Sequence, residues 1–139
     1  PWKGRIAMVG YGTLGTNKIA AAEGFYDALL GSIGAARIME FGDDLGGFTM
    51  WGTSWDKPGL AVTNPYDKNT ATIGNGSMIA LTVDTRAKVD ALHAKALELG
   101  GSCEGPPGVR GDEGPQAFYG AYFRDLDGNK LCAFRTGPA

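Results

Sequence analysis

The sequence predicts an α+β fold built from two tandem βαβββ modules. Two segments have the apolar spacing of helices, each stands among short strand-like runs, and 23 glycines in 139 residues imply many turns. The order along the chain is strand, helix and three strands, repeated once. We expect a single domain over residues 1–139, with module one at about 5–66 and module two at about 77–135.

Each helix is predicted from apolar residues spaced by threes and fours. In the first helix these are Ile19, Ala22, Tyr26, Leu29, Leu30 and Ile33, and in the second they are Val89, Leu92, Ala96 and Leu99. One face of each helix should therefore pack on a sheet. Asn17 and the pair Asp84 and Thr85 mark the two starts, because their side chains can accept hydrogen bonds from the free amides of a first turn.

The strand-like runs cover residues 6–14, 35–41, 48–51, 60–63, 78–83, 102–104, 118–124 and 130–134. The run at 102–104 is the weakest of them. Residues 105–116 are rich in Gly and Pro and are expected to form a long loop. Arg110 in this loop either guards the mouth of a ligand site or is simply solvated.

An internal repeat supports the two modules. Asn17 lies 67 positions before Asp84, and the same offset relates Tyr11 to Met78 and Phe25 to Leu92. A unit of this length is too long for a solenoid repeat and fits two modules of one domain. No linker or low-complexity segment separates the halves.

The motif Gly10-x-Gly12-x-x-Gly15 imitates a dinucleotide-binding loop. In a dinucleotide fold the helix would begin inside the motif, and a second crossover helix would follow the next strand. Here the expected helix cap follows Gly15, and the residues after Glu40 have the pattern of further strands. We therefore expect the glycines to let a strand curve or to let another backbone come close.

Charge and composition exclude several classes of partner. The 13 Lys and Arg against 15 Asp and Glu give a net charge of -2 with no basic run, so neither nucleic acid nor an anionic membrane is an expected partner. No apolar run approaches a membrane span, and no signal-peptide core follows Pro1, so we expect a cytoplasmic protein. Cys103, Cys132 and His93 form no metal-ligand pattern; we expect free thiols and a solvated or hydrogen-bonded histidine.

Three stretches resemble the vicinal oxygen chelate superfamily, which includes glyoxalase I, extradiol dioxygenases and bleomycin-binding proteins. They are LGTNKIAAAEGFYDALL, NGSMIALTVDTRAKVDALHAKALELGG and AYFRDLDGNKLCAF, in which residues 125–128 look like the last hairpin turn of the family. The resemblance covers nearly the whole chain. It implies that curved sheets form a cup, that single-domain members are homodimers, and that metal-dependent members carry ligands on four strands.

At those four strands the sequence departs from the usual His and Glu ligands. Tyr11 and Met78 stand at the two His positions, Cys132 stands at the last Glu position, and the remaining position is Leu60 or Val62. A phenol, an aliphatic chain, a thioether and a thiol suit a divalent ion poorly. We therefore expect no bound metal and no cofactor.

Strand alternation gives a second view of the same positions. Met78, Ala80 and Thr82 should share one face, as should Lys130, Cys132 and Phe134, which makes the cup apolar and aromatic. Trp51 and Trp55 are further candidates for stacking on an aromatic ligand. The candidate ligand-binding residues are Tyr11, Trp51, Trp55, Leu60, Met78, Cys132 and Phe134.

Three functional hypotheses follow. The first is a metal-free protein of the glyoxalase and bleomycin-resistance type that binds a partly aromatic or hydrophobic small molecule. The alternative is a glyoxalase-like lyase or dioxygenase-type enzyme with atypical ligands, in which Tyr11 and Cys132 carry acid–base chemistry. A purely structural or partner-binding domain is the third, because a fold alone does not specify an activity.

Overall fold

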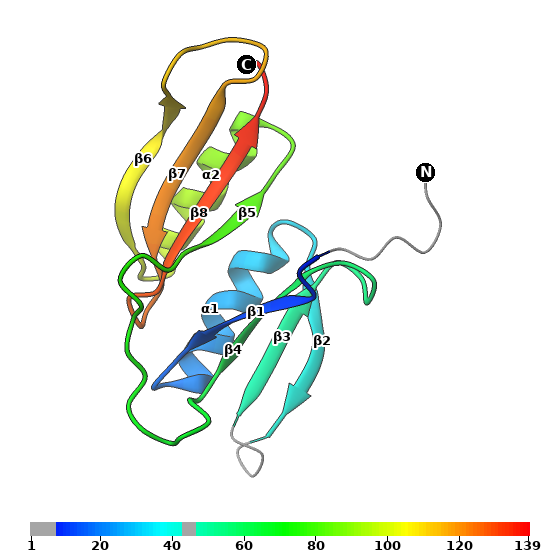
Figure 1. Ribbon diagram of the computed structural model, residues 1–139, viewed down its shortest axis with the longest axis vertical. Helices are drawn as coiled ribbons and strands as arrows, with labels where there is room; N and C mark the ends of the chain where they lie inside the picture. Colours follow the sequence, from blue (N-terminus) through cyan, green and yellow to red (C-terminus); the bar gives the residue numbers. More distant parts are fainter. Residues whose placement is uncertain (1–7, 43–46) are drawn as a thin grey trace. The chain divides into compact units, whose positions relative to one another are not determined.

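The computed structural model describes residues 8–42 and 47–139. The chain divides into two compact units, Pro1–Thr72 and Ile73–Ala139. Each unit contains one helix lying against one face of a four-stranded sheet (Figure 1). The predicted α+β class and the two tandem βαβββ modules are confirmed. The division falls between the predicted modules, and the single-domain organisation stays a prediction.

The first unit consists of β1 (Tyr11–Gly15), α1 (Ile19–Gly31), β2 (Ala36–Phe41), β3 (Phe48–Gly52) and β4 (Gly59–Thr63). Its sheet has the order β1-β4-β3-β2, with β1 parallel to β4 and the other pairs antiparallel. The buried residues of α1 are Ala22, Phe25, Tyr26, Leu29 and Leu30. The predicted apolar stripe is thus the face that packs on the sheet, where Tyr26 contacts the ring of Trp51 on β3.

The second unit repeats this plan with β5 (Ile79–Thr82), α2 (Arg86–Glu98), β6 (Ser102–Arg110), β7 (Phe118–Arg124) and β8 (Lys130–Thr136). Its sheet has the order β5-β8-β7-β6, again with the outer parallel pair β5 and β8. The buried residues of α2 are Val89, Leu92, His93 and Ala96. Neither of the helices in the described ranges is long and apolar enough to cross a membrane.

The prediction for the start of α1 was wrong in one respect. The N-cap residue is Lys18, with no capping side chain, and Asn17 is used differently. Its side chain exchanges two hydrogen bonds with the backbone of Ala71, so it fixes the segment after β4 beside the start of the helix. Thr85 does cap α2, since its hydroxyl accepts from the amide of Lys88 at 3.1 Å.

Two strands also differ from prediction. Tyr11 begins β1, and the first part of the predicted run, residues 6 and 7, lies outside the described residues. In contrast, β6 runs through the predicted Gly/Pro loop as far as Arg110. It is an edge strand with two register shifts, at Gly105 and before Gly108, and an edge strand with bulges tolerates prolines that a central strand would not.

The glycine motif lies in and before β1, with Thr16, Asn17 and Lys18 between Gly15 and the helix. A Cβ added at Gly15 would lie 3.2 Å from the Cβ of Ala71. The segment after β4 therefore comes close at Gly15, through the side chain of Ala71 rather than the predicted backbone. The motif does not have the geometry of a dinucleotide-binding loop, in which the helix begins within the glycines.

Candidate functional site

The second sheet has one face covered by α2 and one open face. On the covered face Phe123 and Leu131 are fully buried, the ring of His93 in α2 lies 6.4 Å from that of Phe123, and the Tyr119 hydroxyl donates to Asp90 of α2. Strand alternation places the intervening residues on the open face. They are Ala80 and Thr82 of β5, Lys130, Cys132 and Phe134 of β8, and Phe118, Tyr122 and Arg124 of β7.

The predicted alternation in this unit is therefore confirmed. Cys132 pairs with Ala80 on one side and Tyr122 on the other, and all three side chains share the open face. Cys132 is nonetheless buried, because its larger neighbours cover it. Phe134 stacks on Phe118 with ring centroids 5.4 Å apart and planes 9° apart, which makes an aromatic platform further along the same face.

A cavity of about 650 Å³ opens on this face. Its walls combine apolar side chains, a tight glycine turn and two cations: Ile73, Gly74, Asn75, Gly76, Ser77, Met78, Tyr122, Arg124 and Lys130. Met78, predicted to be a pocket wall, lines this cavity. An apolar wall with a few convergent polar groups is the usual composition of a small-molecule site.

Tyr122 stands at the centre of the charged part of the face. The Lys130 ammonium from β8 and the Arg110 guanidinium from β6 each lie 5.4 Å from its ring centroid. These strands flank β7, so the two cations approach the ring from either side. Arg110 reaches back along its own strand and donates to the carbonyls of Gly108 and Pro106, at 2.9 and 2.7 Å, which holds its guanidinium over Tyr122.

Arg124 is the third cation of the face, and it is neutralised. It donates to the Glu104 carboxylate at 2.8 Å and to the Gly128 carbonyl at 3.0 Å. Within the described part of the chain, neither Arg110 nor Lys130 has an ion pair of this kind. The open face therefore carries an excess of positive charge around Tyr122.

Cys132 lies beneath these groups as a neutral thiol. Burial raises the pKa of Cys132, and this effect outweighs the lowering by the hydrogen bond of Tyr122 and by the positive charges of Arg110 and Lys130. Since the thiolate is the reactive form, Cys132 is not poised as a nucleophile. It contributes a small, apolar floor to the site.

In the first unit, the predicted site residues fall on both faces of the sheet. Tyr11 lies on the open face, where its ring contacts Phe48 edge to face at 6.0 Å, and its side chain is 54% exposed. Trp55 follows β3 in a turn and is 69% exposed, outside the sheet. Trp51 and Leu60 pair with each other in the ladder and lie on the face that α1 covers, away from the open face.

Leu60 and Val62 are the two residues predicted for the fourth-strand position. Both are buried on the helix-covered face, and Ala61 between them pairs with Thr13 and Met50 on the open face. A run of three apolar residues gives no alternation by which the sequence could have assigned the faces.

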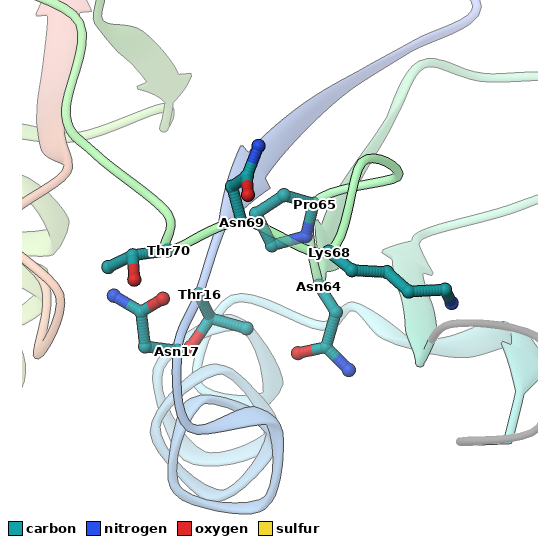
Figure 2. Close-up of a pocket in the computed structure, with 7 residues that line it drawn as sticks. All are labelled: Thr16, Asn17, Asn64, Pro65, Lys68, Asn69 and Thr70. Atoms are coloured by element: carbon teal, nitrogen blue, oxygen red, sulfur yellow. The ribbon is translucent and has the colours of Figure 1, made fainter.

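A second pocket, of about 360 Å³, lies where β1 leads into α1. Its lining is polar, and Figure 2 shows these residues: Thr16, Asn17, Asn64, Pro65, Lys68, Asn69 and Thr70. The side chains of Thr16 and Asn17 are engaged by the Lys18 amide and by the Ala71 backbone. This pocket therefore has fewer free groups to offer a ligand than the open face of the second sheet.

Comparison with known proteins identifies the family. The sequence profile of the glyoxalase/bleomycin resistance protein/dioxygenase superfamily matches residues 5–133. The chain belongs to this superfamily. A comparison with curated protein sequences gives no match.

Several solved structures share this fold. A glyoxalase/bleomycin resistance protein from Albidiferax ferrireducens T118 is 33% identical, and the match covers 92% of this chain and 98% of that one with a TM-score of 0.77. A hypothetical protein from S. aureus is 25% identical over 95% of both chains, with a TM-score of 0.69. Glyoxalase I from Zea mays is 17% identical with a TM-score of 0.71, a likeness of fold over 94% of this chain and 45% of the maize chain.

The residues at the superfamily's four ligand positions do not fit a catalytic metal. Tyr11, Met78 and Cys132 stand at three of these positions by the resemblance, and on the fourth strand Ala61 is the residue that lies on the open face. Ala61 has no donor atom, the sulfur of Met78 is soft and uncharged, and the pKa of Cys132 is raised. Among residues 8–42 and 47–139, no group of three or more His, Cys, Asp or Glu side chains could hold an ion.

Sequence analysis missed the residue at the centre of the site. Tyr122 was not a candidate, although its side chain points to the same face of β7 as that of Phe118 and it pairs with Cys132. Counting back from Cys132 through the hairpin turn would have found it. Arg110 could not have been placed, because its contact depends on β6 extending through a segment that looks like a loop.

Proposed function

We propose that this protein binds a partly aromatic or hydrophobic small molecule on the open face of the second sheet, without a catalytic metal. The observation that carries the proposal is the cavity of about 650 Å³ walled by Met78, Tyr122 and Lys130. Its volume lies within the roughly 300–1,000 Å³ typical of small-molecule sites. The stacked rings of Phe118 and Phe134 extend the apolar surface of the same face.

An enzymatic role of the glyoxalase or dioxygenase type is the weaker alternative. It needs a metal or a general acid and base, and the donor set at the four ligand positions fits neither role well. Burial raises the pKa of Cys132, so near neutral pH its thiol is neither a base nor a nucleophile. Binding alone requires only the shape and chemistry of the face.

The proposal is tested by thermal shift with a panel of small aromatic and dicarbonyl compounds, with and without divalent metals. A compound that binds only the folded state raises the melting temperature by mass action. We expect aromatic compounds to raise it independently of added metal. Failure of every compound, or a rise only in the presence of metal, would contradict the proposal.

A matched pair of variants ties binding to this face. Met78→Glu places a carboxylate in the cavity wall, and Leu97→Glu places one on α2; the two side chains are similarly exposed in the parent, at 42% and 38%. We expect Met78→Glu to abolish the thermal shift of an aromatic probe and Leu97→Glu to preserve it. Equal responses of the two variants would show that the probe binds elsewhere.

We also propose that the protein is a cytoplasmic homodimer. Membership of a superfamily in which dimers are common supports the assembly, and a sheet with unpaired edge strands gains from a partner. Two free cysteines fit a reducing compartment. Light scattering at high micromolar concentration should give the mass of a dimer, and a monomer mass would contradict this assembly.

A further inference from the structure

We propose that the ligand is an organic anion, whose carboxylate or phosphate is held beside Tyr122 by Arg110 and Lys130. This inference rests on the proposed function and specifies the chemistry of its ligand. It starts from an imbalance on the open face of the second sheet. Among the described residues, three cations stand there, Arg110, Arg124 and Lys130, with one carboxylate, that of Glu104, which Arg124 holds at 2.8 Å. The chain as a whole has a net charge of -2, so the excess is local.

Of the two remaining cations, Arg110 is held in place by hydrogen bonds and Lys130 lies over the ring of Tyr122. Two backbone carbonyls accept from the guanidinium of Arg110, and the ammonium of Lys130 lies at the same distance, 5.4 Å, from the Tyr122 ring centroid. Because its partners are neutral carbonyls, the Arg110 guanidinium is not paired with a carboxylate, and it loses little side-chain freedom when an anion binds. A guanidinium with free N–H groups and an ammonium are the groups that proteins use to bind carboxylates and phosphates.

Close packing around the Arg110 side chain shows that its position is built into the strand. A Cβ added at Gly105 would lie 3.2 Å from Nη2 of Arg110, and one added at Gly108 would lie 3.3 Å from Nη1. The two glycines of the bulged part of β6 thus leave the space in which the guanidinium lies. The bulged part of β6 was predicted to be a loop. In the structure it brings the guanidinium of Arg110 over the ring of Tyr122.

The remainder of the face suits the apolar body of such a ligand. Ile73 and Met78 line the cavity beside Lys130, and Cys132 is a neutral floor between Tyr122 and Ala80. The aromatic pair Phe118 and Phe134 lies further along the same strands. An aromatic acid would place its charge between the cations and its ring on apolar surface.

The experiment compares probes of one shape and different charge by titration calorimetry. The probes are 2-naphthoate, the neutral 2-naphthamide, and 2-naphthyl phosphate. We expect each anion to bind at least about tenfold more tightly than the amide, a difference of about 1.4 kcal/mol. The preference should shrink when salt rises from about 0.02 to about 0.5 M, because salt screens the attraction. The ratio of the two anions then distinguishes a carboxylate site from a phosphate site.

Matched charge variants locate the effect. Lys130→Met and Arg110→Met should each reduce anion affinity about tenfold and leave amide affinity within about twofold. Lys88→Met, which removes one charge from an exposed residue of α2 paired with Asp84, should leave the anion preference intact. This control separates a local site from a general effect of net charge.

The outcomes separate this inference from the proposed function. If the amide binds as tightly as the anions and Met78→Glu abolishes binding of all three probes, the face binds small molecules and the anion inference is wrong. If the anion preference survives in both Lys130→Met and Arg110→Met, the charge recognition lies elsewhere and the inference is again wrong. If no probe binds, both the inference and the proposed function are contradicted for aromatic ligands.

Discussion

Ala61 and Cys132 occupy equivalent positions in the two modules. Ala61 pairs with Thr13 in the parallel β1–β4 ladder, Cys132 pairs with Ala80 in the parallel β5–β8 ladder, and Thr13 and Ala80 are related by the 67-residue repeat. The two strands that would supply carboxylate ligands in a metal-dependent member thus carry a methyl group and a buried thiol.

This relationship leads to a prediction about metal binding. The purified protein should carry no stoichiometric Zn, Ni, Fe or Mn by elemental analysis, and should not convert the hemithioacetal of methylglyoxal and glutathione. Neither module offers enough ligands at these positions to replace the hydration shell of an ion. About one bound ion per chain, lost on substituting Cys132, would contradict the prediction.

The same site can be tested by gain of function. Met78 immediately precedes β5 and Cys132 lies near it on β8, so Met78→His with Cys132→Glu places an imidazole and a carboxylate on one open face. We expect calorimetry to show Ni²⁺ or Zn²⁺ affinity at least about tenfold above that of the parent. The control is Met78→Gln with Cys132→Gln, which has similar bulk and no charged ligand; equal metal affinity in both pairs would contradict the assigned positions.

The two thiols should differ in reactivity. Cys103 is exposed and Cys132 is buried with a raised pKa, so an aromatic disulfide reagent should modify Cys103 readily and Cys132 only after unfolding. In the Cys103→Ser variant, the rapid reaction of Cys103 should be absent from the native protein. In denaturant, one thiol per chain, that of Cys132, should then react. A rapid native reaction in this variant would show that Cys132 is an accessible thiolate and would revive the enzymatic alternative.

The sequence predicted the helices and most strands because their signals are local. Apolar residues such as Tyr26 and Leu92 repeat with helical spacing, and the last strand alternates through Leu131 and Ala133. The predictions were wrong where the structure of a segment depends on residues far away in the sequence. Asn17 had the chemistry of a cap but bonds to Ala71, 54 residues away, and the Gly/Pro stretch of β6 is a strand only because β7 pairs with it.

The candidate site was predictable in part for the same reason. Parity placed Met78 and Cys132 on the open face, since two alternating strands define it. Trp51 was assigned to the ligand by its size, whereas its indole lies under α1 and donates to Asp27. A large aromatic side chain serves a core and a binding site equally well, so its type alone does not distinguish them.

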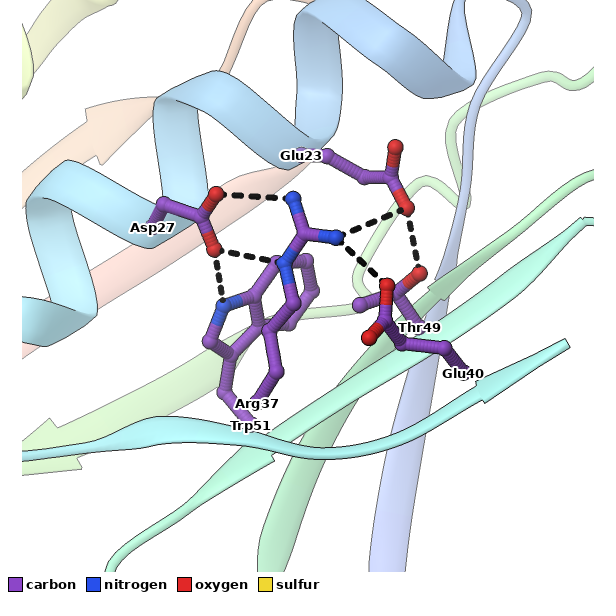
Figure 3. A network of polar contacts seen from close by, with 6 residues as sticks. All are labelled: Glu23, Asp27, Arg37, Glu40, Thr49 and Trp51. Carbon is purple, nitrogen blue, oxygen red and sulfur yellow. Dashed lines mark hydrogen bonds and ion pairs between the residues drawn. The ribbon is translucent and has the colours of Figure 1, made fainter. Parts of the chain in front are cut away.

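Arg37 should contribute measurably to the stability of the first unit. It donates to both oxygens of Asp27 at 2.8 and 2.7 Å and to Glu40 at 2.6 Å, and thereby joins α1 to the edge strand β2 (Figure 3). This guanidinium lowers the pKa of Asp27. We expect Arg37→Met to lower the free energy of unfolding, measured with denaturant, by about 1 kcal/mol. This value is below the usual range for hydrogen bonds to charged groups because the Asp27 side chain is 44% exposed and solvent screens the interaction.

The control for Arg37 uses a weakly held cation. Lys95 lies 3.7 Å from Glu98 at the end of α2, and Lys95→Met should change stability by less than about 0.5 kcal/mol. Arg37→Lys, which keeps the charge and loses the two-pronged geometry, should fall between them. An Arg37→Met variant as stable as Lys95→Met would show that the network in Figure 3 is not a stabilising contact.

His93 should make the protein less stable in mild acid. Its imidazole is 7% exposed against the sheet, and among the described residues its Nε2 has no hydrogen-bond partner, so the predicted solvated or satisfied histidine is corrected on this point. Burial lowers the pKa of His93, more than the nearby charge of Asp90 raises it. The unfolded chain therefore binds a proton at a higher pH than the folded one does.

The sign of the effect follows from this difference. Stability from neutral His93 is fully present above its unfolded pKa of about 6.5 and is lost as pH falls from there toward the lower folded pKa. The slope for one proton is at most about 1.4 kcal/mol per pH unit. Denaturant unfolding between about pH 5 and pH 7 isolates this effect, because paired carboxylates such as Glu113, with a pKa of about 2, begin to lose their contribution only near the unfolded value of 4.5.

The variant His93→Phe keeps a ring against Phe123 and removes the titrating group. Its free energy of unfolding should be nearly flat over this pH range, while that of the parent falls as the solution becomes more acidic. Asp90→Asn tests the opposing charge: without that carboxylate the folded pKa of His93 should fall further, which extends the loss of stability to lower pH. Parallel pH profiles for the parent and His93→Phe would show that the buried imidazole is not the group that sets the acid sensitivity of the second unit.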